Sequence, residues 1–160
     1  MPTPTDDHTS EDRQLVTFRV GEEEFGVDIL SVREIHRVMD VTRVPHAPEF
    51  VDGVVNLRGQ VVPVVDLRKR FGLEPAAPGR STRIVVVELG TVVVGFLVDA
   101  VCQVRRVAAD ALDAPPPLVA GLAREYIEAV ARVEDGLLIL LDLRRLLDRR
   151  EADELRSLGA

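Results

Sequence analysis

Two aspartates stand in the same short motif at two places in the chain. Asp66 and Asp142 each follow an apolar run and precede Leu-Arg. Carboxylates from two similar lobes could share a proton and activate water, as in aspartic proteases. That chemistry uses Asp-Thr-Gly or Asp-Ser-Gly loops, and neither aspartate lies in one. We therefore expect each to cap a following helix, over residues 67–71 and 143–150, by accepting a backbone N–H.

No other group of residues indicates a reaction. His8, His36 and His46 are scattered, and with the single Cys102 they lack the spacing of a zinc site. No serine lies in a Gly-x-Ser-x-Gly turn, and no glycine-rich phosphate loop is present. We predict no catalytic residue, no metal and no cofactor. A hydrolase whose site is assembled from distant residues stays open as an alternative, because members of a catalytic triad need not be neighbours in sequence.

Composition limits the partners and the compartment. The chain has 160 residues, a net charge of −7 and a single lysine, so binding to nucleic acid through phosphates is disfavoured. A lone cysteine excludes an internal disulfide and fits a reducing compartment, and the valines around Cys102 predict that it is buried. The apolar segment 84–98 is interrupted and too short to span a bilayer. Residues 1–13 are polar and are expected to form a flexible tail.

The chain repeats itself. Residues 49–71 match residues 125–147 at a constant offset of 76 positions, from Glu49 to Glu125, and both copies contain Asp-Leu-Arg. Before that, an offset of 69 places Gly21 on Gly90 and Gly26 on Gly95. The sequence therefore predicts two similar units, over about residues 15–73 and 82–149, separated by the Pro- and Gly-containing segment 74–81.

The elements expected in each unit are short strands. Hairpins are predicted from residues 15–20 with a turn at 21–24, and from 84–89 with 92–98. Valine-rich strands punctuated by Gly and Pro favour small closed barrels, because closure removes exposed sheet edges. Neither unit is large enough to bury a stable core on its own, so we expect the two units to share an apolar core.

The two copies differ where one carries paired charges. The turn at residues 56–59 is Asn-Leu-Arg-Gly, whereas residues 132–135 read Arg-Val-Glu-Asp, and Glu34 corresponds to Gln103. Arg58 and Glu34 are therefore an acid and a base found in the first copy alone. They could form a surface ion pair of little energetic consequence. Alternatively, Arg58 could anchor an interface by holding a carboxylate or backbone oxygens in two bonds.

Motifs spread from about residue 14 to residue 150 carry a resemblance to a known family. The matching motifs in the first half are Phe25-Gly26-Val27-Asp28-Ile29-Leu30, Val32-Arg33-Glu34-Ile35, Val41-Thr42-Arg43-Val44-Pro45 and the run from Phe50 to Arg68 that contains Asn56-Leu57-Arg58-Gly59. Those in the second half are Gly95-Phe96-Leu97-Val98-Asp99-Ala100-Val101 and the run from Gly136 to Leu143. Together these motifs resemble the CheW-type coupling domain of bacterial chemotaxis.

The resemblance implies an all-β fold of two five-stranded SH3-like barrels around a shared hydrophobic core, with residues 151–160 as a helix or tail. It implies a non-enzymatic adaptor that couples chemoreceptor cytoplasmic tips to the regulatory domain of a CheA-type histidine kinase, in the cytoplasm at receptor arrays. An adaptor of a non-flagellar pathway is the alternative. The positions that the resemblance assigns to partners are Val32, Glu34, Ile35, Gly53, Arg58, Gly59, Gly95 and Val101. Ala129 stands where the family usually has Gly, which would hinder a positive φ there.

Overall fold

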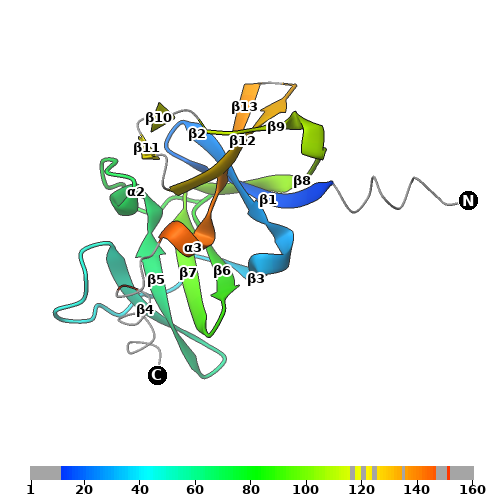
Figure 1. Cartoon of the computed structure of the whole chain (residues 1–160). Helices are drawn as coiled ribbons and strands as arrows, with labels where there is room; N and C mark the ends of the chain where they lie inside the picture. Colours follow the sequence, from blue (N-terminus) through cyan, green and yellow to red (C-terminus); the bar gives the residue numbers. More distant parts are fainter. Residues whose placement is uncertain are drawn as a thin grey trace, which may run out of the picture.

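The protein is built almost entirely from strands (Figure 1). Its computed structural model describes residues 12–115, 118–119, 122–123, 126–134, 136–146 and 151. Strands of the first half are β1 (Arg13–Val20), β2 (Glu23–Asp28), β3 (Val32–Arg37), β4 (Val51–Leu57) and β5 (Gln60–Asp66). Those of the second are β6 (Arg83–Leu89), β7 (Val92–Val98), β8 (Ala100–Val107), β9 (Leu112–Asp113), β10 (Leu118–Val119), β11 (Leu122–Ala123), β12 (Ile127–Val133) and β13 (Gly136–Leu141).

Short helices fill the connections. These are the 3-10 turns η1 (Ile29–Ser31) and η2 (Ala109–Ala111), and the α-helices α2 (Leu67–Arg70) and α3 (Leu143–Leu146). Both α-helices begin after an aspartate as predicted: Asp66 Oδ1 accepts from the Arg68 N–H at 2.9 Å, and Asp142 Oδ1 accepts from the Arg144 N–H at 3.1 Å. The capping interpretation is confirmed. Of the second predicted helix, residues 147–150 lie outside the described residues, as do residues 1–11 of the expected tail.

Each sheet combines strands from both halves of the chain. The five-stranded sheet has the order β3-β6-β7-β5-β4, and the six-stranded sheet has the order β8-β1-β2-β13-β12-β9. We call the units built on them the five-stranded barrel and the six-stranded barrel; in Figure 1 they lie below and above α3. The β6–β7 hairpin of the second half joins the first-half strands through a parallel contact of β7 with β5. The β1–β2 hairpin of the first half joins the second-half strands in the same way, through β2 and β13.

The duplication extends to irregularities of the backbone. The register of β3 against β6 shifts between Val32 and Glu34, and that of β1 against β8 shifts opposite Cys102. The register of β4 shifts between Val51 and Gly53, as does that of β12 between Ile127 and Ala129. These bulges fall at the offsets of 69 and 76 found in the sequence. Since a bulge is a specific local geometry, its repetition supports a true duplication.

Three apolar clusters hold the barrels together. The largest is shared and takes buried side chains from both sheets, including Phe18, Phe25 and Phe96. Each barrel also has an outer core on the opposite side of its sheet. That of the five-stranded barrel contains Leu57 and Ile84, and that of the six-stranded barrel contains the Ile84 equivalent, Leu15. Burial on both faces of the sheets explains why the strands read as nearly continuous apolar runs.

The structure decides two expectations about single residues, Cys102 and Ala129. The prediction that Cys102 is buried was wrong: the side chain is exposed, because it is the extra residue of the bulge in β8 and does not follow the inward alternation of the strand. Partial burial still raises the pKa of its thiol. Ala129 is buried in β12, and it is not among the described non-glycine residues with positive φ, which are His46 and Arg58. The Gly-to-Ala departure therefore has no backbone cost there.

Candidate functional site

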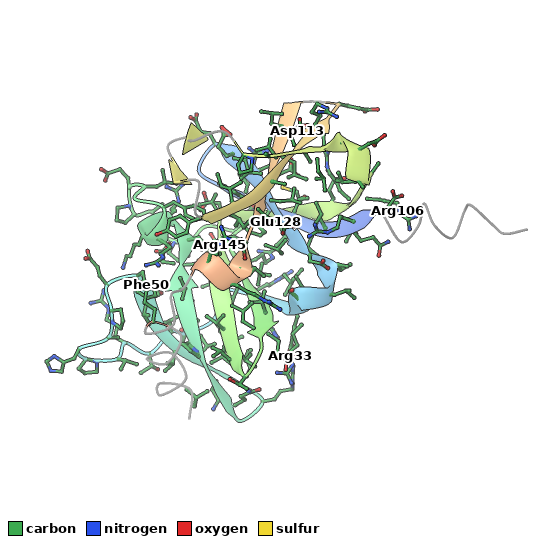
Figure 2. The ribbon with its side chains drawn as sticks, viewed as in Figure 1. Arg33, Phe50, Arg106, Asp113, Glu128 and Arg145 are labelled. Atoms are coloured by element: carbon green, nitrogen blue, oxygen red, sulfur yellow. The ribbon has the colours of Figure 1, made fainter. Side chains whose placement is uncertain are left out.

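Three polar side chains meet at one end of the five-stranded barrel. Glu34 and His36 lie two residues apart on β3, and Arg58 lies in the turn between β4 and β5. The Arg58 guanidinium donates from Nη2 to Glu34 Oε2, and His36 Nε2 lies 2.7 Å from Glu34 Oε1. Figure 2 shows Arg33, the neighbour of Glu34, at this lower end of the molecule. We call these three residues the β3–turn cluster.

The turn holds Arg58 in an unusual backbone conformation. Arg58 has φ of 51° and the following Gly59 has φ of 86°, the two positive values that a type I′ hairpin turn requires. Asn56 reinforces the turn, because its Oδ1 accepts from the Gly59 N–H at 2.8 Å. A non-glycine residue in this region costs about 1 to 3 kcal/mol and is found preferentially at functional sites. Arg58 is nevertheless 70% exposed, so packing does not explain its conformation.

Glu34 acts as the centre of the cluster. Hydrogen bonds from Arg58 and then from His36 lower the pKa of its carboxyl group, so the group stays ionised near neutral pH. Its side chain is only 21% exposed, and each of its oxygens already has a partner. The carboxylate therefore orients Arg58 and His36, while most donors of the exposed guanidinium remain directed to solvent.

The equivalent end of the six-stranded barrel has a different polarity. Gln103, Arg105 and Glu134 replace Glu34, His36 and Arg58 at the same offsets. Arg105 Nε lies 3.9 Å from Glu24 Oε2 on the neighbouring hairpin. Glu134 is exposed at the β12–β13 turn, which lies at the opposite end of the molecule from the β4–β5 turn (Figure 1). One end thus presents an arginine where the other presents a glutamate.

Val32 and Ile35 lie on the other side of β3 from Glu34. The bulge at Arg33 allows this, because Val32 pairs with Val87 and Ile35 pairs with Val85, both of which belong to the shared core. Val32 is half-buried against that core, whereas Ile35 remains 41% exposed. The strand therefore offers an apolar surface on one side and the polar cluster on the other.

Gly53 and Gly59 have clear structural roles. A Cβ on Gly53 would clash with the carbonyl oxygen of Thr42 and lie 2.6 Å from Val41 Cγ1. Removing that space would break the two 2.8 Å backbone hydrogen bonds between Thr42 and Val54. Gly59 has open space around it and provides the second positive φ of the turn that carries Arg58.

Gly95 and Val101 are not members of the cluster. Gly95 is buried where β5 and β7 run parallel, and a Cβ there would lie 2.7 Å from Ile84 Cγ2. Val101 is half-buried against the shared core. Any influence of Gly95 on a partner must therefore act through packing of the five-stranded barrel.

Sequence reasoning missed two arginines that join the halves. Arg68 makes two hydrogen bonds of 2.8 and 2.9 Å to Asp99, which also accepts from the Gly21 N–H. Arg70 lies between Phe50 and its equivalent Tyr126, 4.6 and 5.5 Å from the ring centres. Only the long-range fold brings these residues together. His36 was also missed as a cluster member, although its spacing of two from Glu34 places both on one side of a strand.

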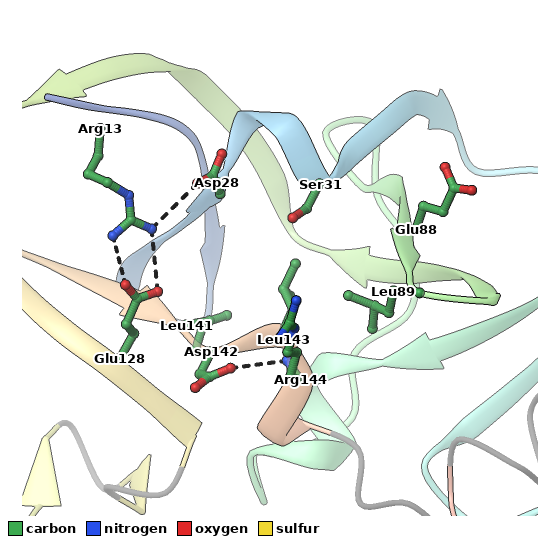
Figure 3. Close-up of a pocket in the computed structure, with 11 residues that line it drawn as sticks. Arg13, Asp28, Ser31, Glu88, Leu89, Glu128, Leu141, Asp142, Leu143 and Arg144 are labelled. Carbon is green, nitrogen blue, oxygen red and sulfur yellow. Dashed lines mark hydrogen bonds and ion pairs between the residues drawn. The ribbon is translucent and has the colours of Figure 1, made fainter. Parts of the chain in front are cut away.

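A cavity between the barrels gives no support to a hydrolase (Figure 3). It measures about 330 Å³, and its lining includes Ser31 but no histidine. The Arg13 guanidinium in the cavity forms ion pairs with two carboxylates: Nη1 lies 2.7 Å from Glu128 Oε2, and Nη2 lies 3.6 Å from Asp28 Oδ2. Within the described residues, no three His, Cys, Asp or Glu side chains are grouped so that they could hold a metal ion.

The structure is thus a pair of small barrels joined through one core, with an exposed arginine on a turn of positive φ. The chain belongs to the CheW family: residues 14–151 match the model of the CheW-like domain. It is 37% identical to the "Probable chemotaxis protein CheW" of Rhizobium etli, over 89% of this chain and 92% of that protein. It is 34% identical to "Protein FrzA" of Myxococcus xanthus, over 85% of this chain and 86% of that protein.

A solved structure agrees with this assignment. The scaffolding protein TtCheW from Thermoanaerobacter tengcongensis superimposes with a TM-score of 0.79 at 34% identity, covering 87% of this chain and 90% of that one. The all-β fold of two SH3-like barrels and the resemblance to CheW are thereby confirmed. The protein is an adaptor scaffold of chemotaxis signalling. Among the described residues, no helix has the length and apolar character needed to cross a bilayer.

Proposed function

We propose that the chain bridges the cytoplasmic tip of chemoreceptors and the regulatory domain of a CheA-type histidine kinase. The observation that carries this proposal is Arg58: an exposed guanidinium held by Glu34 on a turn whose backbone conformation is otherwise unfavourable. Arginine is enriched among residues that dominate binding energy at interfaces. Bridging these partners needs no catalytic step by the adaptor. Because both partners lie on the cytoplasmic side of the membrane in this proposal, we expect the chain in the cytoplasm beside the receptors.

The apolar side of β3 suits the receptor. Receptor tips are helical hairpins in this proposal, and an amphipathic helix binds by laying its apolar face into a hydrophobic groove. Val32 and Ile35 supply partly exposed apolar area next to the shared core. Leu30 is a further exposed apolar side chain of this segment: it is 91% exposed in η1, immediately before β3.

The charged ends suit a kinase domain built from a similar pair of barrels. Such a partner would dock end to end, with the Arg58 turn of one molecule facing an acidic turn of the next. Glu134 shows that this fold can carry an acid at the equivalent turn. Contacts of this heterologous kind close into rings when the rotation between neighbours allows it.

The test is reconstitution of the three proteins. The purified chain is mixed with the kinase and with a receptor cytoplasmic fragment from the same organism, and co-sedimentation and kinase activity are measured. The proposal predicts that all three assemble and that kinase activity responds to receptor only when the chain is present. Assembly that proceeds equally well without the chain contradicts the proposal.

A non-flagellar chemosensory pathway is the second candidate. The relative FrzA carries a name different from CheW, and this chain matches it over most of both lengths. In this second candidate function, the chain binds the receptor and kinase of a non-flagellar chemosensory system. Co-purification from cells identifies which kinase accompanies the chain and separates the two pathways.

A further inference from the structure

We propose that His36 is a pH-responsive member of the β3–turn cluster, whose protonation strengthens binding of Arg58 to an acidic side chain of the docking partner. The proposal rests on the proposed function, because it needs a protein partner at this end of the five-stranded barrel. It adds the chemistry of the group that Arg58 binds and a means of regulating that contact.

The exposed guanidinium of Arg58 can bind an acidic side chain of a partner. Arg58 uses one Nη2–H on Glu34, while a guanidinium offers five N–H donors and no acceptor. With 70% of the side chain exposed, the remaining donors face outward. A carboxylate matches this planar group in two parallel hydrogen bonds, and no neutral acceptor pairs with it as strongly. The partner group that fits is therefore an aspartate or glutamate.

The charge of Glu34 limits that binding. Glu34 holds Arg58 from the protein side, and its own negative charge repels an approaching carboxylate. With neutral His36, the charges of Glu34 and Arg58 cancel. A carboxylate can only accept hydrogen bonds, so the Nε2 atom that lies 2.7 Å from Glu34 Oε1 carries the hydrogen. Nδ1 is then the atom that takes up a proton.

The sign of the effect follows from the charges. Protonation of His36 changes the charge of the cluster from zero to +1, which favours an incoming carboxylate. A charged imidazole also shares more of the Glu34 charge, so Glu34 holds Arg58 less strongly. Both effects make binding tighter when His36 is charged than when it is neutral.

The charged groups near His36 come from its own strand and from the segments beside it. On β3, Glu34 lies on the same side and Arg37 on the opposite side, and Arg33 is the extra residue of the bulge next to Glu34. From β6, the residues opposite His36 and Glu34 are the apolar Ile84 and Val86, and Arg83 donates to backbone oxygens of Arg80 and Thr82. From the β4–β5 turn, Arg58 is the charged group that contacts Glu34. The ionic partners that lower the pKa of Glu34 are Arg58 and His36.

The second half of the chain suggests the decisive variants. Arg105 occupies the position of His36 in the six-stranded barrel, so a permanent cation is compatible with this strand geometry. His36→Arg fixes the charged state, and His36→Gln keeps a donor for Glu34 but is neutral at every pH. His46→Asn is the matched control, because His46 is exposed and asparagine tolerates its φ of 67°.

The experiment measures affinity by calorimetry at pH 6 and pH 8, with the kinase regulatory domain and the receptor fragment titrated separately. For the partner that contacts Arg58, the unmodified chain and His46→Asn should bind about two- to five-fold more tightly at pH 6, the range for an exposed charge pair. His36→Gln should lose that difference, and His36→Arg should bind at pH 8 as tightly as the unmodified chain does at pH 6.

The outcomes separate this inference from the proposed function. Binding without a pH difference, or a difference that His36→Gln retains, overturns the role of His36 while the adaptor function stands. Failure of the chain to bind either partner at both pH values contradicts the proposed function itself. Circular dichroism of each variant shows whether it is folded. If His36→Arg does not fold, the loss of the pH difference in His36→Gln is the result that tests the role of His36.

Discussion

The two ends of the molecule share a scaffold but differ in the charges that they display. The β4–β5 turn carries Arg58, held by Glu34, whereas the β12–β13 turn carries Glu134. The strands, bulges and outer cores around the two turns are equivalent. Side chains that maintain the same fold in both copies are expected to stay alike in kind. The reversal of charge at the turns is what the proposed function expects if the two turns contact different partners.

The largest expected effect comes from removing this difference. Arg58→Glu makes the first turn resemble the second and should weaken assembly with the partner by about 2 to 5 kcal/mol, the range for a hydrogen-bonded charge lost from an interface. Unfolding should change little, since an exposed ion pair contributes about 0.2 to 1 kcal/mol. The measurements are partner affinity and thermal unfolding of the free chain.

The control for Arg58→Glu is Arg80→Glu, which makes the same change in net charge at an exposed site between the halves. Equal loss of affinity in both variants would mean that overall charge, not the turn, governs assembly. Collapse of the melting temperature with assembly intact would assign Arg58 to the fold.

A second comparison tests whether Gly53 serves the fold or a partner. Gly53→Ala should cost about 2 to 4 kcal/mol of unfolding free energy, because the added carbon clashes with the Thr42 carbonyl group. The equivalent Ala129→Gly should cost about 1 kcal/mol or less, from chain entropy. Urea denaturation of the two variants measures both. A stable Gly53→Ala protein that no longer assembles would instead identify Gly53 as part of the interface.

The repeat in the sequence predicted much of this arrangement but not its long-range contacts. Offsets of 69 and 76 locate the equivalent strands, and they single out Arg58 and Glu34, which the structure brings into contact. Which hairpin joins which sheet depends on the parallel contacts of β5 with β7 and β13 with β2, and strand patterns do not encode pairing between distant segments.

Bulges account for the errors at single residues. A strand alternates sides strictly, so an extra residue reverses the side on which later residues lie. Cys102 was predicted to be buried because valines surround it, but it is the extra residue of a bulge and is exposed. The bulge at Arg33 likewise puts Val32 and Ile35 on one side of β3 despite their odd spacing. No composition signal marks these bulges, although their repetition at equivalent positions makes the second predictable once the first is known.

The contact of Arg68 with Asp99 joins the two halves and has no equivalent in the other copy. Burial would raise the pKa of Asp99, but hydrogen bonds from Arg68 and the Gly21 N–H outweigh it and lower the pKa. At the equivalent position the chain has the exposed Leu30. Asp99→Asn should cost about 1 to 2 kcal/mol at pH 7, within the range for charge-assisted hydrogen bonds after allowance for partial exposure.

The pH dependence gives the sign for Asp99. Because its folded-state pKa is lowered, its contribution is present above the pKa of the unfolded chain and is lost as pH falls through the folded value. Asp99→Asn should therefore be less destabilising at about pH 3.5 than at pH 7. Asp113→Asn, in an exposed pair with Arg132, is the control and should have little effect at either pH. Denaturation midpoints at both pH values decide this.

The smallest effect compares the two helix caps, which have the same sequence but different surroundings. Asp142→Ala should cost about 1 kcal/mol as a lost cap, with assembly intact.

Asp66 is buried, and desolvation raises its pKa above the usual value. Its charged form is therefore disfavoured in the folded state, and acidification favours the folded chain through this group. The destabilisation caused by Asp66→Ala should grow as the pH is lowered from about 7 to 4, as urea titrations would show. A constant difference would mean that Asp66 is as well solvated in the folded chain as in the unfolded one.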